Sequence, residues 1–154
     1  ARGWQCALTV PRELSMRDGK LCQQPAHEIE RMRGDCVRAT GGETVEEPGR
    51  LFDLVVSCEG AKMVELEIRK GVFVCYADGM LTLDMGDEGY GRDQRSIELS
   101  ELRDLRVLSD TTMVEIFANG GEAALTSRTY SPAVPAMELH AEGAASMNFY
   151  RLVH

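Results

Sequence analysis

The sequence has little positive charge. Lys and Arg number 17 among its 154 residues, against 25 Asp and Glu, so the formal net charge is −8. Binding of nucleic acid or of an anionic membrane depends on clustered Lys and Arg, and this balance argues against both kinds of partner. No apolar run approaches the ~20 residues of a membrane span. No secretory signal pattern opens the chain, so the expected location is cytoplasmic.

The sequence also lacks a cysteine framework. Its five cysteines, at positions 6, 22, 36, 58 and 75, are widely spaced and form no C-x-x-C pair. An odd number of scattered cysteines is typical of free thiols in a reducing compartment. Cys58 and Cys75 lie in apolar strand patterns, and we expect both thiols to be buried and unreactive.

Signatures of metal, phosphate and nucleophilic sites are missing too. His27, His140 and His154 are isolated from Cys, His and carboxylate partners at ligand spacing, so we expect no metal. The glycine-rich stretch 86–94 has no following Lys-Ser/Thr and helix, which a phosphate cradle needs. No G-x-S-x-G motif is present. We therefore expect no cofactor.

Aromatic side chains make up only 6% of the residues. A lectin-like protein uses exposed aromatic rings as platforms for sugars. The four phenylalanines fall in apolar strand patterns that predict core positions: Phe52, Phe73, Phe117 and Phe149. Trp4, Tyr90 and Tyr130 remain, and Tyr90, in the glycine-rich loop, is the first candidate for a sugar contact.

Short strand patterns are what the chain has in abundance. They cover residues 50–58, 62–69, 72–76, 80–85, 96–99, 134–141 and 146–153, with turn residues between them. The run 62–69 alternates, which places Val64, Leu66 and Ile68 on one face and Glu65, Glu67 and Arg69 on a solvated face. Short strands at regular spacing predict an all-β fold, an antiparallel β-sandwich.

The first 34 residues are organised differently. Residues 4–10 form a strand-like run, and residues 13–22 predict a hairpin that turns at Asp18-Gly19. Residues 26–33 then predict the one helix, with acidic residues early, basic residues late and Gly34 as its C-cap. This helix has the character of a linker between two bodies.

The stretch 105–128 predicts three consecutive strands. Asp110-Thr111 separates the first from the second, and Asn119-Gly120-Gly121 supplies the positive φ angles of a tight turn. Glu115 lies mid-strand between apolar neighbours, so we expect it to pair with Arg106 or Arg128. Ile116 and Phe117 point to opposite sides, so at most one faces the interior if the other side is solvated.

Two segments carry a resemblance to a known family. Asp110-x-Thr112-x-Val114-Glu115-Ile116-Phe117-x-Asn119-x-Gly121 resembles the signature near the end of glycoside hydrolase family 32 enzymes, the invertases, fructanases and sucrose-6-phosphate hydrolases. The run 4–14 and the segment 18–25 resemble the place where that family's catalytic β-propeller meets its C-terminal β-sandwich. The signature residues in this sequence are Pro11, Arg12, Glu13, Asp110, Glu115, Phe117 and Asn119. Departures from the pattern include Cys6, Cys22, Met113 and the Gly120-Gly121 pair.

The resemblance implies a division of the chain. Residues 1–33 correspond to the end of the catalytic propeller plus the linker helix, and residues 34–154 to a jelly-roll, concanavalin A-like sandwich. The family's catalytic motifs are absent: Arg17-Asp18-Gly19 and Arg92-Asp93-Gln94 lack the proline of Arg-Asp-Pro, and Cys58-Glu59 reverses the Glu-Cys order. We therefore expect no catalytic residue here, and an inactive fragment.

The implied partner is the N-terminal catalytic propeller of the same chain, with a homodimer as a second contact. The parent enzyme would hydrolyse sucrose, sucrose 6-phosphate or fructans. A free-standing carbohydrate-binding module is the alternative interpretation. A structural interaction domain of an unrelated protein is a third, which would leave both motif matches unexplained.

Overall fold

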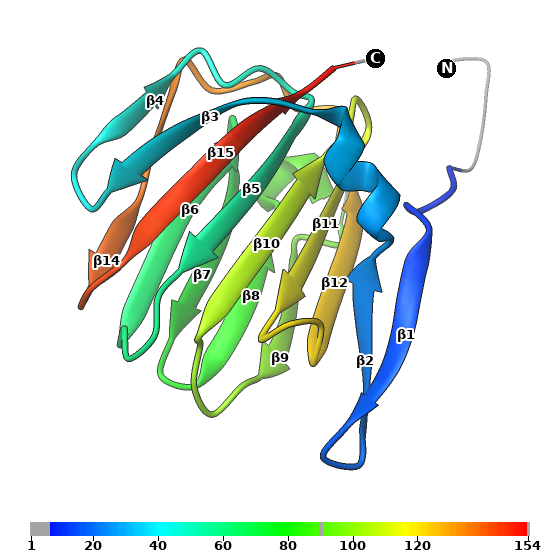
Figure 1. The fold of residues 1–154 in the computed structure, drawn as a ribbon. Helices are drawn as coiled ribbons and strands as arrows, with labels where there is room; N and C mark the ends of the chain where they lie inside the picture. The colour runs from blue at the N-terminus through cyan, green and yellow to red at the C-terminus, as the bar shows by residue number, and fades with distance from the viewer. Residues whose placement is uncertain (1–6, 90, 154) are drawn as a thin grey trace.

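Two antiparallel sheets stacked face to face form the body of the protein (Figure 1). The computed structural model describes residues 7–89 and 91–153. One sheet has six strands in the order β12-β11-β10-β5-β15-β3, and the other has five in the order β14-β6-β7-β8-β9. The predicted all-β antiparallel sandwich is confirmed. None of the helices in these residues is long and apolar enough to cross a lipid bilayer.

The strands are short and follow one another closely. The six-stranded sheet contains β3 (Arg33–Thr40), β5 (Phe52–Ser57), β10 (Asp104–Ser109), β11 (Met113–Ala118), β12 (Ala123–Arg128) and β15 (Ser146–Leu152). The five-stranded sheet contains β6 (Met63–Arg69), β7 (Val72–Ala77), β8 (Met80–Asp84), β9 (Gln94–Glu98) and β14 (His140–Glu142). A separate pair consists of β4 (Thr44–Glu46) and β13 (Ala136–Glu138), and a short 3-10 helix, η2 (Gly86–Gly89), precedes β9.

The core fills the space between the sheets because each strand turns alternate residues inward. Leu54, Val107 and Ile116 of the six-stranded sheet are fully buried in one cluster with Leu66 and Val74 of the five-stranded sheet. These apolar contacts supply the main driving force for stacking the sheets.

The first described segment carries a hairpin, β1 (Arg12–Arg17) and β2 (Lys20–Pro25), which we call the amino-terminal hairpin. Its turn is at Asp18-Gly19, as predicted, with φ of 49° and 76°. Figure 1 shows this hairpin outside the sandwich, next to β12. Since Gln23 N–H donates to the carbonyl of Gly121 at 2.9 Å, the sandwich holds the hairpin directly.

Several local predictions were wrong. Residues 7–11 form no strand, and residues 4–6 of the predicted run, with Trp4, lie outside the described part. The helix is a 3-10 helix, η1 (His27–Met32), rather than 26–33, and Gly34 does not cap it. The chain becomes extended at Arg33 because β3 starts there, with Arg33 opposite Leu152. Residues 134–141 split between β13 and β14, which belong to different sheets.

Arg69, on the five-stranded sheet, differs most from its predicted position. The alternation placed it on the solvated face, but the pairing of β6 with β7 shifts between Glu67 and Arg69, and the side chain turns inward. It is fully buried and donates to Ser109 Oγ and to the Ser131 carbonyl, each at 3.0 Å. Burial lowers its pKa to about 10, so it stays charged at neutral pH. Arg69, at the end of β6, is therefore hydrogen-bonded to the end of β10 through Ser109 and to the loop after β12 through Ser131.

Phe73 also departs from its predicted core position. It is half-buried on the outer side of β7, whereas Phe52 and Phe149 lie in the core with ring centroids 5.3 Å apart.

Candidate functional site at the hairpin–sandwich contact

Glu115 is the centre of the contact between the amino-terminal hairpin and the six-stranded sheet. It lies in the middle of β11 on the outer face and is only 2% exposed. Arg12 Nη2 approaches its Oε2 at 2.5 Å, and the Val10 N–H donates to its Oε1 at 2.7 Å. Both carboxylate oxygens are therefore bound by the segment that precedes the sandwich, and neither is left to act as a nucleophile or a base.

The expectation that Glu115 pairs with an arginine is confirmed, but both named partners were wrong. The register places Leu108 and Thr126 directly opposite Glu115. Arg106 lies one row away and binds Asp53 instead. Arg12, from 103 positions earlier in the sequence, takes the place that Arg106 and Arg128 were expected to fill.

Arg12 is fixed by more than its ion pair. Its Nη1 donates to Gln23 Oε1 at 2.9 Å, and Nη2 donates to Thr126 Oγ1 at 2.8 Å. The guanidinium carbon lies 5.1 Å from the centre of the Phe117 ring, within cation–π range. Phe117 is therefore buried on the outer face beneath Arg12, while Ile116 is buried in the core. Both are buried because this face is not solvated.

The turn between β11 and β12 has the predicted geometry. Asn119, Gly120 and Gly121 have φ of 52°, 62° and 87°. Asn119 Oδ1 accepts the Arg103 N–H at 2.8 Å, and Asp104 Oδ1 accepts the Gly120 N–H at 2.8 Å. The Asn119 side chain thus fixes the turn to the loop before β10.

The Gly120-Gly121 pair, a departure from the family's pattern, is explained by the close approach of the hairpin. Gln24 Nε2 and Arg17 Nη2 both donate to the Gly120 carbonyl. A Cβ at Gly121 would lie 2.0 Å from the carbonyl oxygen of Gln23, which no native contact tolerates. Only glycine allows β2 to come this close, so the Gly120-Gly121 pair is part of the surface that binds the hairpin.

Asp53 forms a second buried charge cluster that the sequence analysis missed. It is fully buried on β5 and binds Arg106 through two parallel contacts, Nε to Oδ1 at 2.9 Å and Nη2 to Oδ2 at 2.7 Å. Arg33 Nε donates to the same carboxylate at 2.7 Å. Both arginines also contact Glu30 of η1, at 3.4 and 3.5 Å. An aspartate inside the apolar run 51–56 was the available signal, because a buried charge needs a partner.

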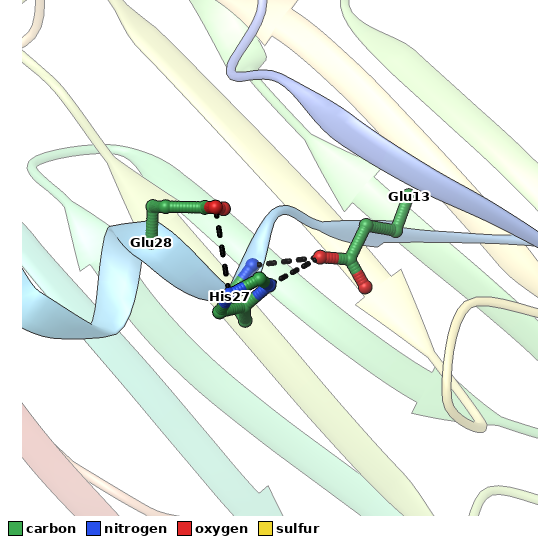
Figure 2. Close-up of side chains that lie close together, drawn as sticks. All are labelled: Glu13, His27 and Glu28. Atoms are coloured by element: carbon green, nitrogen blue, oxygen red, sulfur yellow. Dashed lines mark hydrogen bonds and ion pairs between the residues drawn. The ribbon is translucent and has the colours of Figure 1, made fainter.

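Figure 2 shows Glu13, His27 and Glu28, which the structure brings together at the base of the hairpin. His27 Nδ1 lies 2.7 Å from Glu13 Oε1, and Nε2 lies 3.4 Å from Glu28 Oε1. The view of His27 as isolated was therefore wrong. The hydrogen bond that His27 donates to the Glu13 carboxylate is the main cause of a raised pKa for His27, and the same bond lowers the pKa of Glu13.

These three side chains have ligand atoms within 4.8 Å of one another and are all exposed. Two flanking carboxylates favour the protonated imidazolium, whereas a metal requires the neutral ring. The geometry is that of an ion-pair cluster that joins β1 to η1.

The remaining predicted site residues are structural in their contacts or are not described. The Pro11 carbonyl accepts the Ala26 N–H at 2.8 Å and closes the base of the hairpin. Asp110 Oδ1 accepts the Thr111 N–H at 2.5 Å and shapes the β10–β11 turn. Tyr90 lies outside the described residues. Tyr130 is half-buried, 5.4 Å from the Arg128 guanidinium.

The two thiols expected to be buried differ. Cys58 is fully buried, as predicted, and burial raises its pKa to about 12. Cys75 is half-buried, and burial together with nearby Glu65 raises its pKa to about 11. Neither thiol forms the thiolate at neutral pH.

The fold and this contact define a class: an antiparallel β-sandwich whose outer face binds the hairpin that precedes it. Residues 75–152 match the family model described as glycosyl hydrolases family 32 C terminal. The chain belongs to glycoside hydrolase family 32 and is its C-terminal domain, as the two signature segments implied.

Two relatives with similar sequences agree with this family membership. The chain is 34% identical to the raffinose invertase of Escherichia coli over 151 residues, covering 86% of this chain and 31% of the relative. It is 31% identical to the sucrose-6-phosphate hydrolase of Salmonella typhimurium over 140 residues, covering 85% of this chain and 27% of the relative. The chain thus spans less than a third of the length of these relatives.

Solved structures show the same fold. The sucrose-6-phosphate hydrolase of Lactobacillus gasseri superimposes with a TM-score of 0.78 at 18% identity, over 92% of this chain and 33% of that one. The exo-inulinase of Aspergillus awamori superimposes with a TM-score of 0.77 at 17% identity, over 99% of this chain and 37% of that one.

Proposed function

We propose that this chain is the non-catalytic C-terminal part of a β-fructofuranosidase-like enzyme and packs against an N-terminal catalytic propeller of the same polypeptide. The parent enzyme would hydrolyse sucrose, sucrose 6-phosphate or fructans. Residues 1–33 would belong to the junction and residues 34–154 to the sandwich. The relatives, invertases and sucrose-6-phosphate hydrolases about three times as long, support this arrangement.

The observation that carries the proposal is the exposed apolar surface of the amino-terminal hairpin. Leu14, Met16 and Leu21 are 64%, 66% and 54% exposed, and Leu8 just before the hairpin is 95% exposed. Met16 and Leu21 are direct cross-strand partners, so they present one continuous patch. A surface of this kind on an otherwise charged protein marks an interaction site. The hairpin itself is anchored to the sandwich through Glu115, so a domain docked on the patch is held to the whole fold.

A fusion tests the proposal. The C-terminal third of the E. coli raffinose invertase would be replaced by residues 7–154 of this chain, and sucrose hydrolysis and thermal inactivation would be measured. We expect an active fusion, and a faster inactivation when Leu14, Met16 and Leu21 are all changed to Ser. Val37→Ser, at an exposed apolar site on β3, is the matched control. Equal inactivation rates of the triple variant and the control would contradict the proposed contact.

The chain alone should release no reducing sugar from sucrose, sucrose 6-phosphate or inulin. Retaining glycosidases need two carboxyl groups about 5–5.5 Å apart that face one sugar pocket. A Glu115→Gln variant, purified in parallel, controls for contaminating host invertase. Activity present in the wild-type chain and lost in a Glu115→Gln variant that is still folded under the assay conditions would make Glu115 catalytic and overturn the assignment. A second copy covering the hairpin patch, detected by sedimentation, would instead identify a homodimer contact.

A further inference from the structure

A groove of about 280 Å³ lies on the outer face of the six-stranded sheet, between the amino-terminal hairpin and strand β15, next to the edge strand β3. Four of its lining residues form a single cross-strand row. Asn148 is opposite Val55, Val55 is opposite Arg106, and Arg106 is opposite Phe117. Neighbouring strands are about 4.8 Å apart, so the row extends about 14 Å, the length of one or two sugar rings.

The groove combines apolar surface with hydrogen-bonding groups. Val55 contributes apolar surface, while Gln24, Asp104, Asn148 and Tyr150 contribute polar groups. Ligand sites are typically built in this way, with apolar walls and a few placed polar atoms. A sugar ring matches the combination because its C–H faces are apolar and its hydroxyl groups both donate and accept.

Several of these polar groups have a donor or acceptor atom that is not hydrogen-bonded to any described residue. Asp104 accepts the Gly120 N–H with Oδ1, which leaves Oδ2 for a ligand donor. Gln24 donates Nε2 to the Gly120 carbonyl, which leaves Oε1. Asn148 receives only a long contact from Cys36 Sγ, 3.9 Å from Oδ1, so its amide N–H groups are available. The residues that line the groove therefore carry two acceptor atoms and one amide donor to which no described residue is hydrogen-bonded.

The charges around the groove select against anions. The two guanidinium groups at its base, Arg33 and Arg106, are paired with two carboxylates, buried Asp53 and Glu30 of η1. The remaining charged lining group is Asp104, so these five groups together carry a net negative charge. A phosphate group would be repelled here, whereas a neutral hydroxylated ligand would not.

We propose that this groove is a binding site for a neutral mono- or disaccharide. It goes beyond the proposed packing role. The hairpin forms one wall of the groove through Gln24, and the row Asn148–Val55–Arg106–Phe117 forms its base. The proposal does not depend on docking to a catalytic domain, because Leu14, Met16 and Leu21 do not line the groove.

The test is a titration of the isotope-labelled chain with fructose, sucrose and a short fructan, up to about 50 mM because single-site sugar contacts are weak. We expect saturable shifts of the Val55, Asp104 and Asn148 amide signals. Asn148→Ala and the isosteric Asn148→Asp should each weaken binding about five- to tenfold through loss of the amide donor. Gln94→Ala, an exposed amide on β9 of the other sheet, is the matched control and should leave affinity unchanged.

Sucrose 6-phosphate is the negatively charged ligand to compare with sucrose in the same titration. It should bind the groove more weakly than sucrose, because Asp104 leaves the charged groups around the groove with a net negative charge that repels the phosphate. The proposal is overturned by an absence of saturable shifts, by equal affinities of the Asn148 variants and wild type, or by shifts centred on the cleft lined by Arg92, Arg95 and Arg128. The amide spectrum of each folded variant before titration separates loss of binding from loss of structure.

Discussion

Arg12 and Glu115 join the first strand of the amino-terminal hairpin to the centre of the six-stranded sheet, with 2.5 Å between Nη2 and Oε2. The Glu115 side chain is 3% exposed and that of Arg12 is 19% exposed, so water screens the pair poorly. Two residues of the family signature, separated by almost the whole sandwich, thus act on each other. In the signature near the end of the chain, Glu115, Phe117 and Gly121 all contact the hairpin.

Removal of the Glu115 charge should therefore be expensive. Glu115→Gln leaves Arg12 partly buried without a counter-charge, and we expect a loss of about 3 kcal/mol in the free energy of unfolding. Urea unfolding measures it. Glu122→Gln is the control, since its partner Lys20 is 64% exposed, and it should cost less than about 1 kcal/mol. Similar losses for the two variants would argue against a buried anchor.

Gly121→Ala should release the hairpin without unfolding the sandwich. The new Cβ would meet the Gln23 carbonyl oxygen at 2.0 Å, so β2 must move away. We expect at least tenfold faster amide exchange at Gln23 and its neighbours, with little change in the core strands. Gly19→Ala is the matched control, because its φ is also positive but nothing lies within 4 Å of the added Cβ. It should show only about 1 kcal/mol of backbone strain.

Truncation of either Ile116 or Phe117 to Ala should destabilise the protein. Both are buried, Ile116 between the sheets and Phe117 under Arg12. Lost transfer energy and a residual cavity predict about 2–5 kcal/mol for each in urea unfolding. Val37→Ala, at an exposed site, should change stability by less than about 0.5 kcal/mol. A surface-like value for Phe117→Ala would show that the hairpin does not cover this face in solution.

The Glu13–His27 contact should depend on pH within a defined window. The raised pKa of His27 means that its contribution is complete below the ordinary value of 6.5 and is lost as the pH rises through the folded-state value. The lowered pKa of Glu13 means that its contribution is complete above 4.5 and is lost as the pH falls through its folded-state value. The attraction is therefore strongest between about pH 4.5 and 6.5.

An NMR titration of the His27 ring checks this prediction. Its pKa should exceed 6.5 in the wild-type chain and fall toward that value in Glu13→Gln. A smaller fall is expected in Glu28→Gln, since Glu28 is the more distant partner. An unchanged His27 pKa in Glu13→Gln would mean that the contact is absent in solution.

Much of the fold could be read from the sequence because its signals are local. Asp18-Gly19 and Asn119-Gly120-Gly121 tolerate positive φ wherever they occur, so both turns were predicted correctly. Alternation along 62–69 located β6, and the break at Asp110-Thr111 separated β10 from β11. The two signature segments, one near each end of the chain, also indicated the family. Within each turn, strand and segment, the signal depends on residues within a few positions of one another.

The tertiary structure decided which charges meet. Glu115 binds Arg12 rather than Arg106 because the sheet order places β10 between β5 and β11, and Asp53 on β5 takes Arg106. Arg69 is buried because a bulge in β6 reverses the side-chain alternation. Such choices depend on strand order, register and the docking of a distant hairpin. Because these are set by contacts far apart in the chain, no local pattern of residue types specifies them.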